Sequence, residues 1–223
     1  MQIPAIRFKQ WLKEWDQYDY EISAHRRRPE PHIYLFSMKA ADLRRISDVY
    51  RRRRDGDVAE GIQRRRDESR TARIQRYVKY GYPYGDLRAD QNREEFASLR
   101  KPGWLPTAIV VNILRPGDQR HGQTINAEHV ITIKKGFGSP YTLVIPSIDS
   151  LSQSQLPPLE VIDGQHRLWA FEETDSESPV PDDFELPVVA YHGLDIAWQA
   201  YLFWSINVWS TIRATGSLFV SLG

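Results

Sequence analysis

Apolar residues recur along this chain with two alternating periods, one typical of strands and one typical of helices. A compact apolar run over residues 33–38 predicts a strand, and the three- and four-residue spacing that follows predicts a helix over residues 40–53. A second helix is expected over residues 67–80, ended by the turn residues of Gly81-Tyr-Pro-Tyr-Gly85. The apolar positions of this second helix that should face inward are Ile74, Tyr77 and Val78.

The second half of the chain combines short β-branched runs with two helices. Strands are expected over residues 107–114, 129–134, 141–146, 159–163 and 186–191. A short helix should begin directly after residue 163, and a longer helix over residues 195–208 is apolar on nearly every face. Residues 8–20, rich in tryptophan and tyrosine, are compatible with either a helix or an irregular aromatic clamp.

Length and composition indicate a globular protein with one continuous domain. The 223 residues, 41% hydrophobic and 26% charged, are sufficient to bury a core. The sequence has no cysteine, which excludes disulfides, thiolate metal sites and cysteine-based sulfur chemistry. Because it also shows no long apolar run and no signal-peptide core, we expect the protein in the cytoplasm, with no membrane partner.

Charge is distributed unevenly between two portions of this domain, a basic one at residues 1–100 and a core at residues 101–223. The first portion holds 23 Lys and Arg against 16 Asp and Glu, whereas the second holds 7 against 13. Such asymmetry favours a polyanionic partner for the basic portion.

Two interpretations of the arginine runs in the basic portion stay open. Guanidinium groups match the geometry of phosphates, and tyrosines lie just downstream, which favours contact with DNA. The candidates for DNA binding are Arg51, Arg52, Arg53, Arg54, Arg65 and Arg66, and the tyrosines are Tyr77, Tyr80, Tyr82 and Tyr84. Alternatively, residues 51–54 close a helix whose carboxyl end favours cations, and nearby carboxylates neutralise much of their field.

The most informative motif is Asp163-Gly-Gln-His-Arg167, where an apolar strand ends and a helix starts at once. The first backbone amides of a helix have no hydrogen-bond partner within the helix, and they carry the positive end of its dipole. Gly164 permits close approach of the backbone to a ligand, and the guanidinium of Arg167 can donate two parallel hydrogen bonds. This corner therefore suits a phosphate. The structural alternative is that Asp163 caps the helix, Gly164 forms the turn and Arg167 is solvated.

Other catalytic and metal-binding motifs do not occur in the sequence. The histidines are scattered, so a zinc site is not expected, and neither a P-loop nor a nucleophile elbow is present. Acid, base and cation come together only in Asp163, His166 and Arg167, which are therefore the candidate catalytic residues.

The chain resembles the DGQHR-domain proteins, a branch of the ParB/sulfiredoxin-like superfamily that includes the DndB-type proteins of DNA phosphorothioation systems. Besides the motif itself, five segments agree in order with that family. They are a strand and helix at residues 32–43, the pair Gln63-Arg64 before a helix, a Pro-led strand at 105–114, a Leu-Pro-Val-Val strand at 186–191, and an aromatic helix ending in Ile206-Asn207. The resemblance implies an α+β fold, with a mixed sheet flanked by helices and a helical, basic N-terminal extension.

The resemblance also implies how a ligand is bound. The phosphates of ATP or another nucleoside triphosphate would rest on the backbone of Gly164 and Gln165 and on Arg167. His166 would act as a further phosphate donor or as a proton-transfer group. Phosphoryl transfer depends mostly on positioning and charge, so few residues would suffice for hydrolysis.

Further residues are assigned to this site by the resemblance. Gln63 and Arg64 would complete the phosphate cradle from the basic portion. Asp163 would either cap the helix or hold Mg²⁺, whose usual ligands are carboxylate and phosphate oxygens. Asn207 is expected to be a buried amide, bonded either to the signature loop, which the resemblance favours and which would make it part of the phosphate site, or to a neighbouring carbonyl.

The chain departs from the family pattern after Asn207, where a Gln/Lys-containing turn and a substantial helical portion are usual. The apolar helix at residues 195–208 would leave Trp198 and Trp209 in water if it contacted only a sheet. We expect it to pack on the missing C-terminal portion, on a second subunit of a homo-oligomer, or on residues 8–20.

Three functional classes follow, with nucleotide and DNA as the expected partners. The preferred one is a nucleotide-binding protein, with hydrolysis as an open question, that acts with DNA in a modification or phage-defence system. The second is a non-enzymatic, DNA-binding transcriptional regulator of such a system, in which the same corner grips a DNA phosphate. The third is a structural subunit whose motif only stabilises the fold.

Overall fold

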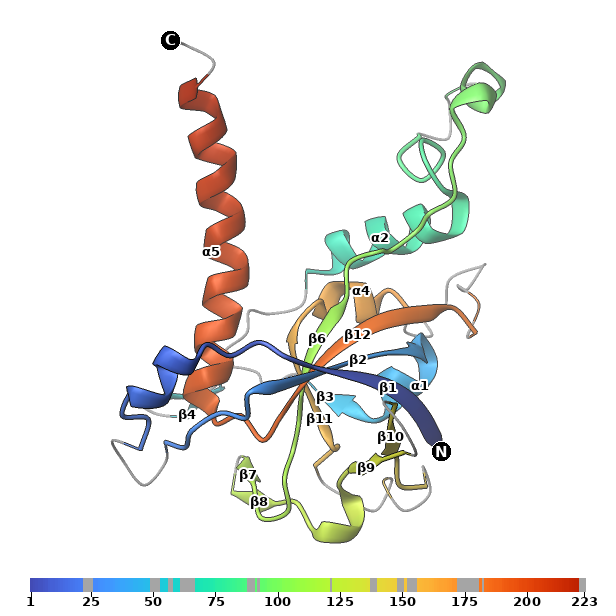
Figure 1. Ribbon diagram of the computed structural model, residues 1–223. Helices are drawn as coiled ribbons and strands as arrows, with labels where there is room; N and C mark the ends of the chain where they lie inside the picture. The colour runs from blue at the N-terminus through green and yellow to red at the C-terminus, as the bar shows by residue number, and fades with distance from the viewer. Residues whose placement is uncertain are drawn as a thin grey trace.

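A twisted, mixed sheet of eight strands forms the centre of the molecule, in the order β3-β11-β6-β12-β2-β1-β10-β9 (Figure 1). The computed structural model describes residues 1–21, 26–48, 53–55, 58–60, 67–87, 91, 93–120, 122–136, 140–147, 151, 156–171, 181 and 183–220. For residues 53–55, 58–60 and 209–220 only the backbone is described. The strands of the sheet are β1 (Gln2–Lys9), β2 (His32–Lys39), β3 (Ser47–Asp48), β6 (Ile109–Ile113), β9 (Thr132–Lys135), β10 (Tyr141–Val144), β11 (Leu159–Asp163) and β12 (Glu185–His192).

Four α-helices and three 3-10 helices accompany the sheet in the described part of the chain. The α-helices are α1 (Ala40–Arg45), α2 (Glu68–Tyr80), α4 (Gln165–Trp169) and α5 (Ile196–Val220), and the 3-10 helices are η1 (Lys13–Gln17), η2 (Arg93–Leu99) and η3 (Ala127–His129). Two small hairpins are formed by β4 (Arg53–Asp55) with β5 (Val58–Glu60) and by β7 (Gln119–Arg120) with β8 (Gln123–Thr124). None of the described helices has the length and apolar character required to cross a bilayer.

The sheet includes strands from both the basic portion and the core. The first half of β1 pairs antiparallel with β10, and its second half pairs antiparallel with β2. At the centre, β6 lies parallel to β12 and antiparallel to β11. The expectation of a helical N-terminal extension is therefore wrong, because residues 2–9 form a strand that pairs with β10 and β2 in the sheet.

The main core lies against the central strands. Ile109, Val111 and Val188 are fully buried there, and Leu43 of α1 and Leu168 of α4 belong to the same apolar cluster. These two short helices therefore cover the sheet, and α2 packs on α4 in turn (Figure 1).

The first helix is much shorter than the sequence predicts. It ends at Arg45, and Ser47 already pairs with Leu159 in the parallel ladder between β3 and β11. The hydroxyl of Ser47 donates to the carbonyl of Leu43 at 2.6 Å, which satisfies one of the last carbonyls of the helix. Arg53 begins β4, so the interpretation of residues 51–54 as a helix end is wrong.

The second helix agrees with the prediction. The Asp67 side chain accepts a hydrogen bond of 3.0 Å from the amide of Arg70, and Gly81, with φ of 74°, ends the helix. The strand expected at residues 129–134 is shifted, because His129 belongs to η3 and β9 starts at Thr132. The runs at 107–114, 141–146 and 159–163 contain β6, β10 and β11, and the run at 186–191 lies within β12.

The aromatic residues near the N-terminus form an irregular clamp on α5. Within it, Trp11 contacts Trp15 and Tyr20 with ring centroids 5.4 and 5.6 Å apart. Tyr20 then packs on Trp198 at 5.7 Å, and the Trp198 indole donates to the carbonyl of Arg27 at 3.1 Å. The expected contact between the helix and residues 8–20 is thus confirmed for Trp198, whereas the side chain of Trp209 lies outside the described part.

Candidate functional site

Gly164 forms the corner at which β11 gives way to α4. Its φ of 92° and ψ of 10° place it in the left-handed region. A Cβ atom at this position would lie 2.7 Å from Cδ1 of Ile109 and 2.9 Å from Nη2 of Arg167, so the corner has no space for a side chain. Gly164 itself caps α4, with its carbonyl accepting from the amides of Arg167 and Leu168 at 3.0 and 3.1 Å. The expected capping role of Asp163 is therefore wrong.

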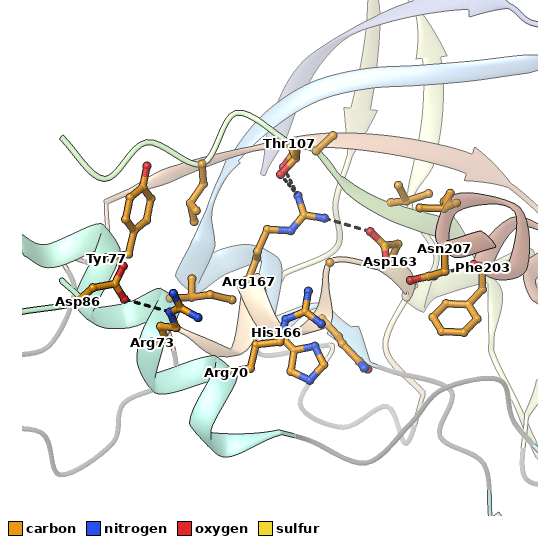
Figure 2. A pocket seen from close by; sticks show the side chains of 17 residues that line it. Arg70, Arg73, Tyr77, Asp86, Thr107, Asp163, His166, Arg167, Phe203 and Asn207 are labelled. Carbon is orange, nitrogen blue, oxygen red and sulfur yellow. Dashed lines mark hydrogen bonds and ion pairs between the residues drawn. The ribbon is translucent and has the colours of Figure 1, made fainter. Parts of the chain in front are cut away.

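Asp163 is instead the ion-pair partner of Arg167. Nη2 of Arg167 lies 3.1 Å from Oδ2 of Asp163, and Nη1 donates to both the carbonyl and the hydroxyl of Thr107 (Figure 2). The two charged side chains are 17% and 24% exposed, respectively, so this pair is screened only in part. Arg167 is therefore fixed in one orientation, and the alternative of a solvated arginine is wrong.

The corner opens into a cavity of about 1050 Å³ between α2, α4 and the first half of α5. The α2 wall consists of Arg70, Arg73, Ile74 and Tyr77, and the α5 wall of Phe203, Ile206 and Asn207. Residues 163–167 form one side, and Leu105, Thr107, Ala108 and Val110, on and before β6, complete the lining with Asp86. The cavity thus brings together segments that are far apart in the sequence.

The α2 wall carries cations that the sequence analysis did not select. Arg73 is paired with Asp86, with Nε 3.0 Å from Oδ1 (Figure 2). Arg70 is exposed, and among the described residues no carboxylate lies within ion-pair distance of its side chain. Burial lowers the pKa of Arg167, and the charge of Arg70 acts in the same direction while Asp163 opposes it. Arg70 and Arg167 therefore repel each other across the cavity.

His166 connects α4 to the start of α2. Its Nε2 accepts a hydrogen bond of 3.3 Å from the backbone amide of Asp67, which requires an unprotonated Nε2. The imidazole packs edge to face on Trp169, with ring centroids 5.6 Å apart. Hydrogen bonds from the Arg70 amide and the Ser69 hydroxyl lower the pKa of Asp67, so the cap of α2 is a carboxylate at neutral pH.

Gln165 contributes a buried polar atom to the cavity. The residue is 6% exposed, and its Oε1 is buried without a hydrogen-bond partner among the described residues. A buried acceptor of this kind is costly unless a donor reaches it. Gln165 lines the cavity, so a ligand donor would reach this shielded atom once its neighbours shift.

Asn207 also lines the cavity, but it is not the buried amide that was expected. It is exposed, and its Nδ2 donates to the carbonyl of Phe203 in the preceding turn of α5 at 2.7 Å. The second of the two interpretations, a bond to a neighbouring carbonyl, is therefore confirmed. Figure 2 places this asparagine beside Asp163, on the α5 side of the cavity.

The remaining predicted residues cannot be compared with the site. Gln63, Arg64, Arg65, Arg66, Arg51 and Arg52 lie outside the described residues, and for Arg53 and Arg54 only the backbone is described. Reasoning from the sequence missed Arg70, Arg73 and Thr107. The first two had a signal, since residues 70, 73, 74 and 77 have the spacing of one helix face.

A magnesium site at Asp163 would need ligands from elsewhere. Among the described residues no group of three or more His, Asp or Glu could hold a metal ion. The Asp163 carboxylate is also paired with Arg167, so a metal ion would have to displace that guanidinium. The side chains therefore do not form a magnesium centre by themselves.

Fold and site together define a mixed α/β protein with a cation-lined cavity at a strand–helix corner. A family model described as "DndB: DNA-sulfur modification-associated" matches residues 25–221. The chain belongs to the DndB family, as the resemblance of its motifs indicated. No curated protein and no solved structure matches the chain, so its place in the ParB/sulfiredoxin-like superfamily stays a prediction.

Proposed function

We propose that this DndB-family protein binds a nucleotide, ATP or another nucleoside triphosphate, in the cavity and acts with DNA in a DNA sulfur modification system. The observation that carries the proposal is that Arg70 and Arg167 face one cavity and repel each other. Arg70 also has no carboxylate partner among the described residues. An anion between the two guanidinium groups would replace their repulsion by two attractive, charge-assisted contacts.

The α2 wall also favours a ligand with an aromatic end. Arg70 and Tyr77 are seven residues apart on one face of the helix, a separation of about 10 Å along its axis. Ile74 and Leu105 line the cavity as well, so apolar groups lie near Tyr77, beside the mutually neutralised pair of Arg73 and Asp86. A nucleotide has the same polarity, with phosphates at one end and a planar base at the other.

Gln165 adds a further reason to expect such a ligand. Its unpartnered Oε1 matches a donor such as a ribose hydroxyl or a base amino group. The size of the cavity, about 1050 Å³, is at the upper end of the range of small-molecule sites, so a whole nucleotide fits.

The geometry supports binding more strongly than hydrolysis. Asp163 and Arg167 are paired with each other, and Nε2 of His166 is occupied by the amide of Asp67. Proton transfer by any of the three would first require that an internal contact be broken. If Mg²⁺ accompanies the ligand, phosphate oxygens and water would supply most of its coordination, as is usual for this ion.

Isothermal titration calorimetry of the full chain with ATP, GTP and CTP, each with and without Mg²⁺, tests the proposal. We expect saturable binding of at least one nucleotide, and about tenfold weaker binding by Arg70→Gln because a charged contact is lost. The matched control is Arg45→Gln, an exposed arginine on α1 that does not line the cavity. Absence of binding for all three nucleotides, or an equal loss in both variants, would overturn the proposal.

A further inference from the structure

The segment after α2 builds a surface that the nucleotide cavity does not use. We call it the tyrosine arm, residues 79–87, 91 and 93–104 of the described chain. Tyr82 and Lys101 exchange two backbone hydrogen bonds of 2.9 and 2.8 Å, which clip its two ends together. In Figure 1 the arm extends beyond the end of α2, away from the sheet, before the chain returns to β6.

Close backbone contacts fix the arm to α2. A Cβ atom on Gly103 would lie 2.0 Å from the carbonyl oxygen of Tyr77, and one on Gly81 would lie 2.0 Å from that of Lys101. Both glycines therefore allow approaches that no other residue would permit. The backbone that carries the aromatic residues of the arm is therefore held in place relative to α2.

Cations lie over two of the tyrosine rings. Lys79 is 4.9 Å from the ring centroid of Tyr80, and Arg100 is 5.1 Å from that of Tyr84. Arg93 lies between the two rings, 5.8 and 5.9 Å from their centroids, and its carbonyl accepts from the Tyr84 hydroxyl at 2.8 Å. The arm is thus an interleaved set of cationic and aromatic groups.

Two further rings of the arm are turned to solvent. Trp104 is 73% exposed and Tyr82 is 52% exposed. No contact joins either ring to another aromatic ring among the described residues. An arm that keeps two large rings in water and carries cations on its other tyrosines indicates a surface for a ligand with flat, apolar faces and negative charge.

We infer that the tyrosine arm binds single-stranded DNA by stacking unpaired bases on Trp104 and Tyr82. Sequence-tolerant binding of single strands elsewhere combines the same two elements, aromatic platforms and cations that follow the backbone. Lys101 is exposed and pairs through its backbone with Tyr82, so its ammonium group is placed to contact a phosphate of a strand bound there. The bases of a duplex are already stacked on one another, so they do not offer free faces. The choice of DNA rests on membership of the DndB family.

The arm also carries negative charge, which limits the electrostatic contribution to its affinity for DNA. Asp86 is neutralised by Arg73, and Glu94 and Glu95 lie on η2. A purely electrostatic surface would not include these carboxylates. We therefore expect stacking, more than phosphate contacts, to supply the affinity of the arm.

Fluorescence anisotropy with a labelled oligothymidylate tests this inference on the full chain. Trp104→Ala should weaken binding at least about fivefold, since one stacked base is lost, whereas Trp104→Phe should retain most of the affinity. The control is Trp204→Ala, which removes an equally large ring, 52% exposed, from α5. Lys101→Gln should lower the slope of log affinity against log salt by about 0.7, the value for one phosphate contact with a single strand.

Three results would overturn the inference. They are absence of oligothymidylate binding, equal affinity of Trp104→Ala and the unmodified protein, and tighter binding of a blunt duplex than of the single strand. ATP titrations of the same variants separate this inference from the proposed nucleotide site. Because Trp104 does not line the cavity, its substitution should leave nucleotide affinity unchanged.

Discussion

The backbone amide of Asp67 donates a hydrogen bond of 3.3 Å to Nε2 of His166. Asp67 caps α2, and His166 lies in the first turn of α4, so this bond joins the helix that carries Arg70 to the motif that carries Arg167. Arg70 and Arg167 are therefore held relative to each other by the motif itself. His166 therefore fixes α2 relative to the motif.

Replacement of Tyr77 tests whether the apolar end of the cavity recognises a base. Tyr77→Leu should weaken ATP about three- to tenfold, the usual range for loss of one aromatic pair, but leave inorganic triphosphate unaffected. Tyr77→Phe keeps the ring and should resemble the unmodified protein. Calorimetry with both ligands distinguishes these cases, and an equal loss for ATP and triphosphate would assign Tyr77 to the fold and not to the ligand.

Removal of the charge of Asp163 should destabilise the corner. Asp163→Asn leaves Arg167, a largely buried cation, without its carboxylate, and we expect the free energy of unfolding to fall by about 1.5–3 kcal/mol. Urea denaturation measures this loss. In a double-mutant cycle with Arg167→Met, the two losses should not add. Additive effects would mean that the pair seen here contributes nothing to stability.

A larger loss is expected at the buried ion pair of Glu160 with Arg120. Both side chains are 6% exposed, and Glu160 also accepts hydrogen bonds from Asn112 and Gln199, at 3.2 and 2.7 Å. Glu160→Gln removes the carboxylate that faces the buried guanidinium of Arg120, so the free energy of unfolding should fall by about 3–5 kcal/mol.

The matched control for Glu160 is an exposed ion pair. Asp86→Asn breaks the contact with Arg73, whose side chain is 70% exposed, and should cost less than about 1 kcal/mol. Thermal or urea unfolding of the two variants side by side checks the difference. Similar losses in both would contradict the burial argument.

The acid stability of the protein should depend on Glu30. Burial by itself would raise the pKa of this carboxyl, but the hydrogen bond and charge of His192, with Arg115, outweigh burial and lower it. A carboxyl with a lowered pKa in the folded state stabilises the fold above its ordinary pKa, and this contribution is lost as pH falls through the lowered value.

Glu30→Gln removes this titration. The variant should therefore be less stable than the unmodified protein near neutral pH, and the difference should shrink below about pH 4.5. Urea midpoints measured across the acid range check the prediction. A difference that grows toward low pH would show that the sign has been assigned wrongly.

Local sequence patterns predicted those elements whose signals are local. The strand–helix corner, the α2 helix and the strand β12 follow from turn residues and periodicity. The end of α1 did not, because Ser47 leaves the helix to pair with Leu159, more than a hundred residues away. A parallel partner so distant in the chain gives no signal in the segment itself.

The site was predicted only in part, again because contacts between distant segments give no signal in the local sequence. The motif at residues 163–167 was identified by composition, whereas Arg70 has the appearance of any exposed helical arginine until α2 is packed on α4. Thr107 could not be identified, since it holds Arg167 partly through a backbone carbonyl. Asn207 was correctly placed near the corner but wrongly buried, because only the fold shows which side of α5 faces solvent.

The hydrogen bond from Gln199 to Glu160 has a consequence for communication through the molecule. It fastens the first turn of α5 to β11, three residues before Asp163, and both side chains are buried. Phe203, Ile206 and Asn207 lie further along the same rigid helix. A protein that engaged the outer half of α5 and tilted it would therefore reshape the cavity, so binding of that protein and affinity for a cavity ligand would be thermodynamically linked in both directions.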